Sequence, residues 1–366
     1  MSIDFLGSKI MRGNEFPIIG TRVKGLNKKF DLSDPRSRSL YFRSKVGTQI
    51  DLIKKYLDNN TFIGYFVGKK NSGKGTYSGL LTEIFGKDKI ELFSVGDMIR
   101  RVYENWKDFS KSERFEKLKS LYRGYISFDE AVDTLLGRST KKLLPTEFIL
   151  AMVKLHISEL PRKSILIDGL PRGMDQVSYS LYFRDVINYR DDPDFFILID
   201  IPTAVISERI KHRVICPICH TSRNKKLLIT SKIEQDKKSK GYYLVCDNPT
   251  CENVRMVPKE GDELGIEPIK ARLQKDEETI KLILSLHGVP RILLRNSIPV
   301  SQAKVNFDGY ELTPEYGFQM DHISGKVKVI EKPWTFKDDN DVLSHSLLAP
   351  PVVVSFIKQL PEVLGL

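Results

Sequence analysis

Five residues between positions 68 and 76 have the types and spacing of a loop that binds phosphate. Glycines allow the backbone to turn so that successive N–H groups point at one phosphate. The amino group of Lys74 would reach the β- and γ-phosphates of a nucleotide, and the hydroxyl of Thr76 would face Mg²⁺. The five residues are Gly68, Gly73, Lys74, Gly75 and Thr76, in the stretch GKKNSGKGT.

Two further segments place acidic and basic side chains where a strand is expected to end. IELFSVGDMIRR, residues 90–101, has Asp97 and Arg100 after an apolar run, and KSILIDGLPRGMDQV, residues 163–177, has Asp168 and Arg172. An acidic residue at the end of a strand parallel to the phosphate-loop strand suits a water ligand of Mg²⁺. An arginine just beyond it can hold a phosphate through two N–H groups.

The flanking residues predict the elements that must position this chemistry. Residues 62–67 form a short apolar run typical of a buried strand, and KGTYSGLLTEIF after the loop is helix-like. The helix would direct the positive end of its dipole at the bound phosphate. Farther upstream, GTQIDLIKKYLDNN is typical of an amphipathic helix that leads into this strand.

All four cysteines lie within one short segment. Cys216 and Cys219 form the pair CPIC, and Cys246 and Cys251 form a looser C-x4-C pair. Four thiolates from two short hairpins suit tetrahedral Zn²⁺, whereas disulfides are rare in cytosolic chains. The sequence predicts a structural zinc site, with His220 as a neighbour and not a ligand.

Composition limits the class of protein. The chain has 366 residues, 41% of them hydrophobic, and a net charge of +11, so acidic partners such as nucleotides are expected. A basic surface also occurs in proteins that bind no polymer, so nucleic acid is an alternative that we do not favour. No apolar run reaches the length of a membrane span, and MSIDFLGSKIMRG lacks the pattern of a signal peptide. We expect a soluble cytoplasmic protein.

Taken together in this order, the segments resemble adenylate kinase and the wider family of nucleoside monophosphate kinases. The similar segments are GKKNSGKGT, SVGDMIR, LLPTEFILAMVK, ILIDGLPRGMDQ, FFILIDIPTAVISERIKHRVICPIC and EPIKARLQKDEETI, and they span about residues 61–285. The resemblance implies an α/β fold, with a P-loop NTPase-type parallel sheet flanked by helices, a helical NMP-binding insert and a zinc-bearing lid. It also implies reversible transfer of phosphate from Mg-bound ATP to AMP, giving two ADP.

The resemblance also implies a role for each matching residue. On the donor side, Lys74 and its loop would hold the ATP phosphates, Arg209 would pack on the ATP adenine, and Asp97 and Asp168 would orient water on Mg²⁺. On the acceptor side, Arg100 and Arg172 would hold the AMP phosphate, while Arg172, Arg213 and Arg272 would act with Lys74 on the transferring phosphate. The expected ATP-loop residues are Gly68, Ser72, Gly73, Lys74, Gly75 and Thr76, and the expected AMP residues are Val95, Arg100, Gly169, Arg172 and Gln176.

The chain departs from the family pattern at several positions. Asn71 replaces a common glycine, which the loop tolerates because asparagine adopts left-handed backbone angles more readily than most residues. Val95 replaces the threonine of adenylate kinases and favours a UMP or CMP kinase, whereas Gln176 favours adenine. Val214 and Lys259 stand where lid arginines are expected, and lysine lacks the planar fork of arginine. A nucleotide-sensing or RNA-associated protein with weak catalysis is therefore a further alternative.

The match also divides the chain into segments. Residues 1–44 are basic and are expected to form an irregular arm, with a protein partner or second subunit as one possible role. Residues 296–345 have no counterpart in the family, and we expect a small β-rich insertion near the ATP end of the core. The expected segments are an N-terminal extension (1–44), core with the phosphate loop (45–93), NMP-binding subdomain (94–160), core (161–213), zinc lid (214–262), core (263–295), insertion (296–345) and terminal core helix (346–366).

Overall fold

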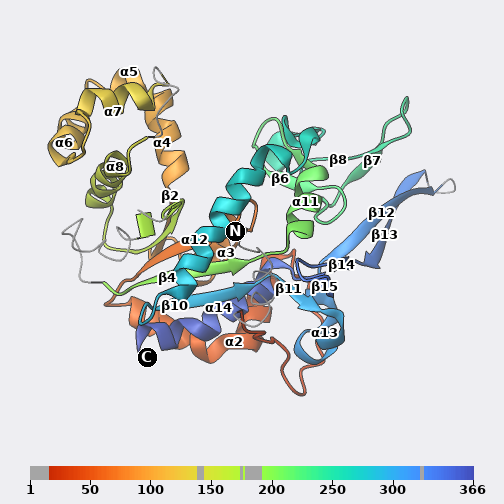
Figure 1. Ribbon diagram of the computed structural model, residues 1–366. Coiled ribbons are helices and arrows are strands. Elements are labelled where there is room, and N and C mark those ends of the chain that lie inside the picture. The colour runs from red at the N-terminus through yellow and green to blue at the C-terminus, as the bar shows by residue number, and fades with distance from the viewer. Residues whose placement is uncertain (1–15, 138–143, 174–175, 178–191, 322–324) are drawn as a thin grey trace, which may run out of the picture.

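A five-stranded parallel sheet forms the centre of the molecule in the computed structural model, which describes residues 16–137, 144–173, 176–177, 192–321 and 325–366 (Figure 1). The strand order is β10-β4-β1-β3-β2, and every neighbouring pair is parallel. This arrangement confirms the expected α/β fold with a P-loop NTPase-type sheet. The strands are β1 (Ile63–Gly68), β2 (Ile90–Ser94), β3 (Ser164–Asp168), β4 (Asp194–Asp200) and β10 (Arg291–Arg295).

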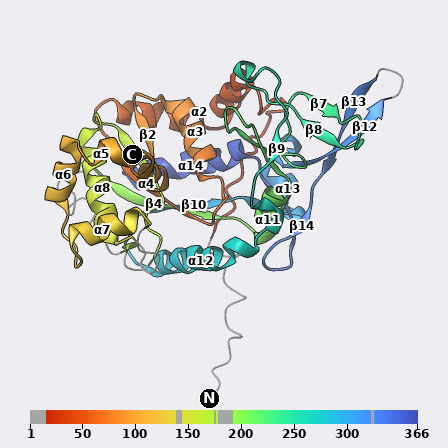
Figure 2. The same ribbon diagram turned by 90° about the horizontal axis from the view of Figure 1, so that it is seen from above.

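Helices cover both faces of this sheet, so its three inner strands, β1, β3 and β4, are buried along nearly their whole length. On one face, Phe62 and Phe66 pack into an apolar cluster with residues of several helices. On the other face, Ile63, Tyr65 and Val67 belong to a second cluster, which also contains helical residues. The views in Figure 1 and Figure 2 show the sheet between these helical layers. The first layer contains α2 (Pro35–Leu57), α3 (Lys74–Phe85) and α14 (Ala349–Leu364), and the second contains α8 (Thr146–Glu159) and α12 (Lys270–Ser285).

The N-terminal extension is more ordered than the sequence indicated. Helix α2 begins at Pro35, with the Asp34 carboxylate accepting a hydrogen bond from the Ser37 backbone N–H (2.7 Å). This start corrects the expectation of an irregular arm up to residue 44, because the N-cap and the proline at the first turn favour an earlier helix. Before the helix, Phe30 is buried in the same cluster as α14. Residues 1–15 of the expected arm lie outside the described part of the chain.

A buried polar network joins the extension to the insertion. Glu311 is inaccessible to solvent and accepts hydrogen bonds from the hydroxyls of Thr21 (2.6 Å) and Tyr41 (2.6 Å). The Lys45 ammonium lies 2.7 Å from Asp308 and 3.8 Å from Glu311. Because a buried carboxylate needs such partners, the network fixes how the two segments pack together.

Two peripheral groups of elements lie on opposite sides of the upper part of the molecule (Figure 1). The helical group includes α6 and α7 on either side of Gly124. It contains α4 (Val95–Glu104), α5 (Trp106–Phe109), α6 (Glu113–Leu121), α7 (Phe128–Leu135) and α8. The cysteine-bearing group follows α11 (Thr203–Lys211) and contains β5 (Arg213–Ile215), β6 (Ser222–Asn224), β7 (Ile233–Gln235), β8 (Tyr242–Leu244), η1 (Pro249–Cys251), β9 (Val257–Pro258), η2 (Asp262–Leu264) and η3 (Glu267–Ile269).

The segment 296–345 is rich in β-structure, as expected, and also contains a helix. Its longest elements form an antiparallel hairpin that lies beside β7 and β8 in both views (Figure 1, Figure 2). Its elements are β11 (Ser297–Pro299), α13 (Val300–Asn306), η4 (Gly309–Glu311), β12 (Pro314–Asp321), β13 (Lys326–Pro333), β14 (Phe336–Lys337) and β15 (Leu343–Ser346). Within the described ranges, no helix has the length and apolar character needed to cross a membrane.

Candidate active site

The loop between β1 and α3 has the backbone conformation that phosphate binding requires. Gly73 has φ 103°, and a Cβ built there would lie 3.0 Å from the ring of Tyr77. Asn71 has φ 65°, so it adopts the left-handed geometry that a glycine would otherwise supply. The Ser72 hydroxyl and the Asn71 side-chain nitrogen are buried, and neither has a hydrogen-bond partner among the residues described. The loop therefore presents unsatisfied polar groups that suit an oxygen-rich ligand.

Lys74 lies across this loop at the start of α3. Its ammonium donates hydrogen bonds to the carbonyls of Gly68 (2.9 Å) and Lys69 (3.3 Å) and lies 3.7 Å from the Asp168 carboxylate. Burial lowers the pKa of Lys74, while the charges of Asp168 and Asp276 act to raise it. Asp168 ends β3 and pairs in register with Phe66 of β1, which is why it reaches the loop. Gly75 and Thr76 are exposed at the first turn of α3.

The residues expected on the acceptor side come from the ends of β2 and β3. The Arg172 guanidinium lies against Gly169 and Gly96, where an added Cβ would approach it to 2.6 Å and 3.4 Å. Gln176 accepts a hydrogen bond from the Arg172 backbone N–H (2.8 Å) and donates to the Thr146 hydroxyl (3.3 Å). Glycine at position 169, with φ 96°, thus leaves room for the arginine beside the strand ends.

Two other acceptor-side predictions, Val95 and Arg100, lie in α4 directly after β2, together with Asp97, which was expected to orient water on Mg²⁺. The side chain of Val95 is buried at the start of α4, so it presents no polar group to a ligand. Asp97 and Arg100 are exposed one turn farther along and form an ion pair of 2.7 Å with each other. In this conformation the Arg100 guanidinium is therefore paired with a carboxylate of its own helix.

The arginines expected around the donor phosphates occupy different environments. Arg209 donates to the Asn71 carbonyl (2.9 Å), so its guanidinium lies against the loop. Arg213 binds both oxygens of Asp262 (2.5 and 2.6 Å) and donates to the Asn71 side-chain oxygen (3.0 Å). Arg272 is exposed on α12. Arg213 therefore connects the cysteine-bearing group to the phosphate loop.

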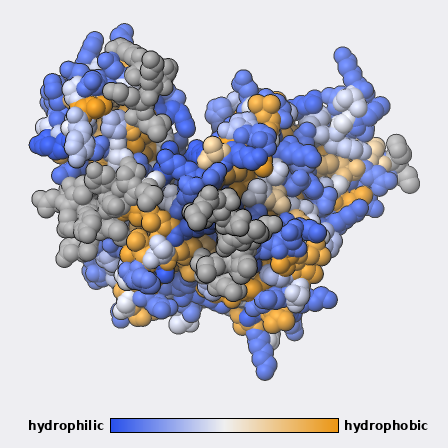
Figure 3. All heavy atoms as spheres, viewed as in Figure 1, coloured by the Kyte–Doolittle hydropathy of each residue, from blue (hydrophilic) through white to orange (hydrophobic). Residues whose placement is uncertain are grey.

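Positive charge collects at the mouth of the loop. Burial and then the charges of Arg272, Lys259 and Arg213 lower the pKa of Lys70. Desolvation and the charge of Arg272 likewise lower the pKa of Arg172. Neighbouring cations disfavour one another's charged form. Such a cluster is expected where a polyanionic ligand binds and neutralises the positive charge. Figure 3 shows a hollow between the helical group and the cysteine-bearing group, bordered mostly by hydrophilic residues.

Asp276 is a site residue that the sequence analysis missed. Its carboxylate accepts a hydrogen bond from the Lys70 backbone N–H (3.1 Å), so it caps the phosphate loop. Burial raises the pKa of Asp276, against the charges of Arg272 and Lys74. The sequence contains a pattern that could have identified Asp276. It follows Arg272 by four positions, and residues four apart lie on one face of a helix.

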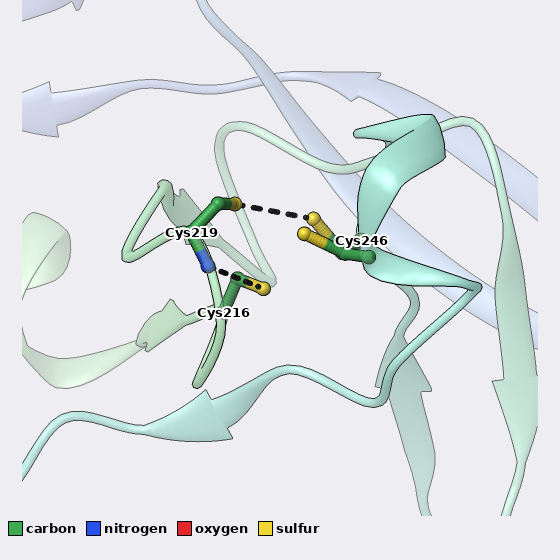
Figure 4. Close-up of side chains that lie close together, drawn as sticks. Cys216, Cys219 and Cys246 are labelled. Atoms are coloured by element: carbon green, nitrogen blue, oxygen red, sulfur yellow. Dashed lines mark hydrogen bonds between the residues drawn. The ribbon is translucent and has the colours of Figure 1, made fainter.

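The four cysteines form a second candidate site. Their sulfur atoms all lie within 4.8 Å of one another, and those of Cys219 and Cys246 are 3.6 Å apart (Figure 4). Tetrahedral Zn²⁺ with Zn–S bonds of about 2.3 Å requires sulfur separations of about 3.8 Å, so the arrangement fits this metal. His220 is exposed and not part of the cluster.

The surroundings of the thiols favour a bound cation. Hydrogen bonds with Thr221 lower the pKa of Cys219 to about 5, whereas burial raises that of Cys251 to about 12. Four clustered sulfurs can ionise together only when a positive charge lies among them. The donor set is therefore suited to a structural metal ion.

No family model matches the chain. The curated proteins that it resembles include several adenylate kinases. The chain is 28% identical over 200 residues to the adenylate kinase of Thermotoga petrophila, which covers 54% of this chain and 73% of that protein. It is 26% identical over 231 residues to the adenylate kinase of Thermotoga neapolitana, a match that covers 63% of this chain and 87% of that protein. It is 28% identical over 221 residues to the adenylate kinase of Mycoplasma mobile, a match that covers 60% of this chain and 82% of that protein.

Proposed function

Since the chain belongs to the adenylate kinase family and is a phosphotransferase, we propose that it transfers the γ-phosphoryl group of Mg-bound ATP reversibly to AMP, giving two ADP. The observation that carries this proposal is Lys74 beside Asp168 at the base of a loop whose mouth is lined with cations. Phosphoryl transfer requires mainly the positioning of two nucleotides and the neutralisation of charge, and no nucleophilic side chain.

On the donor side, the phosphate loop binds the ATP phosphates through the backbone N–H groups of Gly73, Lys74 and Gly75. The Ser72 hydroxyl gains a partner there, and the hydrogen bond from Lys70 to Asp276 must give way to phosphate oxygens. Thr76, Asp97 and Asp168 would hold Mg²⁺ and its water, and this ion would neutralise charge on the phosphates.

On the transferring phosphate, Lys74, Arg172, Arg213 and Arg272 supply positive charge. Arg213 already contacts the loop through Asn71, and it has to exchange Asp262 for a phosphate oxygen. Arg209 holds the Asn71 carbonyl in this structure, so we assign it a second task besides packing on the adenine, namely fixing the loop backbone.

On the acceptor side, Arg100 and Arg172 bind the phosphate of AMP, and Gln176 pairs with the edge of adenine. Val95 and Gly169 line the same site. The buried apolar side chain of Val95 is the observation that favours a second candidate, a kinase of UMP or CMP. We assign residues 94–160 to the acceptor subdomain and residues 214–262 to a lid held by Zn²⁺ on Cys216, Cys219, Cys246 and Cys251.

The test is a coupled assay of ADP release with ATP and, in turn, AMP, CMP, UMP and GMP. The variant Lys74→Met, purified in parallel, controls for contaminating kinases. Turnover with AMP that the variant lacks supports the proposal. Faster turnover with UMP or CMP would favour the second candidate. Nucleotide binding without turnover for any acceptor would indicate a sensing or RNA-associated protein that keeps the fold.

A further inference from the structure

The inserted segment 296–345 reaches the phosphate loop through one carboxylate. Asp339 lies in the loop between β14 and β15 and accepts a hydrogen bond from the Thr203 backbone N–H (2.9 Å). Its second oxygen lies 3.2 Å from the Lys69 ammonium and 3.3 Å from the Thr203 hydroxyl. Asp339 therefore links the insertion, the start of α11 and the phosphate loop.

Lys69 is the residue that makes this contact important for the loop. It directly follows Gly68, and its side chain is only 4% exposed. Its ammonium also donates to the Ile201 carbonyl (3.3 Å) and lies 3.9 Å from Glu277. The Lys69 carbonyl in turn accepts from Lys74 and from the Ser72 backbone N–H (3.0 Å). A displacement of Lys69 would thus shift the backbone that forms the phosphate site.

The loop that carries Asp339 is itself well braced. The neighbouring Asp338 carboxylate accepts hydrogen bonds from the N–H groups of Asn340 (2.9 Å) and Val342 (3.0 Å) and from the Ser344 hydroxyl (3.1 Å). The Asp338 N–H donates to the Val342 carbonyl (3.0 Å). These bonds hold Asp339 in place without help from Lys69, as a positioning group requires.

The same insertion also contacts the cysteine-bearing lid. The Tyr316 N–H in β12 donates to the Lys226 carbonyl (2.8 Å), and Glu315 lies 3.7 Å from the Lys226 ammonium. The Phe318 ring is 5.7 Å from that of Tyr242 and packs against the cluster that contains the cysteines. One segment therefore contacts both the phosphate loop and the cysteine-bearing group.

We propose that Asp339 is a positioning residue for the ATP site, through which the insertion fixes Lys69 and the phosphate loop against the lid. Without its negative charge, the buried Lys69 ammonium loses its closest carboxylate and moves toward other partners, taking the loop backbone with it. This inference rests on the proposed binding of ATP at this loop. It does not depend on which acceptor is used.

The test measures the dissociation constant of ATP by equilibrium dialysis, and the KM values for ATP and AMP, in four proteins. These are the unaltered chain, Asp339→Asn, Lys69→Met and the double variant. Asp339→Asn should weaken ATP binding about tenfold and change the KM for AMP less than about twofold. The double variant should bind ATP at least as well as Asp339→Asn, because the unpaired ammonium has been removed.

The matched control is Asp341→Asn in the same loop. Asp341 is exposed with φ 59°, an angle that asparagine adopts, so this variant should bind ATP like the unaltered chain. ATP affinity in Asp339→Asn equal to that of the control would overturn the inference. Effects of Asp339→Asn and Lys69→Met that simply multiply in the double variant would also overturn it. So would equal increases in the KM values for ATP and AMP, because such increases indicate general unfolding.

The dialysis readout separates this inference from the proposed function. If the unaltered chain binds ATP but phosphorylates no acceptor, the proposed function fails while the effect of Asp339→Asn on ATP affinity still decides the inference. If the unaltered chain binds no ATP, both are overturned.

Discussion

In the central sheet, β1 buries five of its six residues between two layers of helices. In the lid, by contrast, none of the strands β5 to β9 is longer than three residues, and none has more than one buried residue. The apolar cluster of the lid consists of six buried residues, and three of these are cysteines. Within the described chain, the two regions therefore gain stability from different sources.

This difference in burial separates the phosphate loop from the cysteine-bearing group, which we propose as a lid. The sheet holds the strand ends and the phosphate loop through extensive apolar burial, which requires no ligand. The lid has little core of its own, so a metal bound by four thiolates would supply most of its folding free energy. Arg213 lies at the junction and contacts both regions, through Asp262 and Asn71.

The largest effect is expected at the rigid site, from Lys74→Met. Loss of this charge should lower turnover by at least about a hundredfold, because it removes electrostatic stabilisation from the transferring phosphate. The melting temperature should stay nearly constant, since the sheet does not depend on this side chain. Steady-state kinetics and thermal unfolding provide the measurements. Near-normal turnover would falsify the role of the phosphate loop.

The next largest effect concerns the proposed lid and the zinc ion that we expect at its four cysteines. Metal analysis should find about one zinc per chain, as a single site of four thiolates requires. Removal of the metal by a chelator, or Cys219→Ser, should increase hydrogen exchange in residues 214–262 and leave the sheet protected. Turnover should fall because Arg213 is no longer held over the phosphates, while nucleotide binding persists in weakened form.

The control for the lid experiment is Ser222→Ala, at an exposed position of β6. It should retain the metal and the exchange pattern of the unaltered chain. Absence of metal from the purified protein would contradict the comparison between the two regions. Exchange that rises uniformly over the whole chain after chelation would do so as well.

A smaller effect concerns the choice of acceptor nucleotide at the ends of the sheet strands. AMP should turn over at least about tenfold faster than CMP or UMP, a preference of roughly 1.4 kcal/mol, because Gln176 pairs with adenine. The coupled assay measures the ratio, and Val95→Thr should increase it if this position contacts the base. A pyrimidine acceptor that exceeds AMP would assign the chain to the UMP or CMP kinases.

The smallest effect is expected where the insertion touches the lid. Phe318→Ala should increase hydrogen exchange in β7 and β8 by a few fold, because one aromatic contact contributes about 0.5–1.5 kcal/mol. Val329→Ala is the matched control, since Val329 pairs with Phe318 in the hairpin but is 38% exposed. Equal exchange in the two variants would show that this contact does not stabilise the lid.

Local sequence predicted the central features well because their physical causes are local. The apolar run before Gly68, the glycines and the helix after Lys74 predicted the strand, turn and helix that the structure contains. Asn71 was expected to tolerate left-handed geometry and has φ 65°. The short CPIC spacing, with all cysteines in one segment, likewise predicted sulfurs that come together.

By itself, then, the sequence determined the first strand, the phosphate loop with its helix and the cysteine cluster, since each depends on neighbouring residues, whereas the parallel sheet followed from the family resemblance. Only the tertiary structure decided that Asp276 caps the loop, that Asp339 pairs with Lys69 and that Glu311 accepts from Thr21 and Tyr41. Asp339 and Lys69 are 270 positions apart, and Glu311 and Thr21 are 290 apart. Such pairs leave no local pattern, because the chain brings them together only when apolar burial on the two faces of the sheet has packed its distant segments against one another.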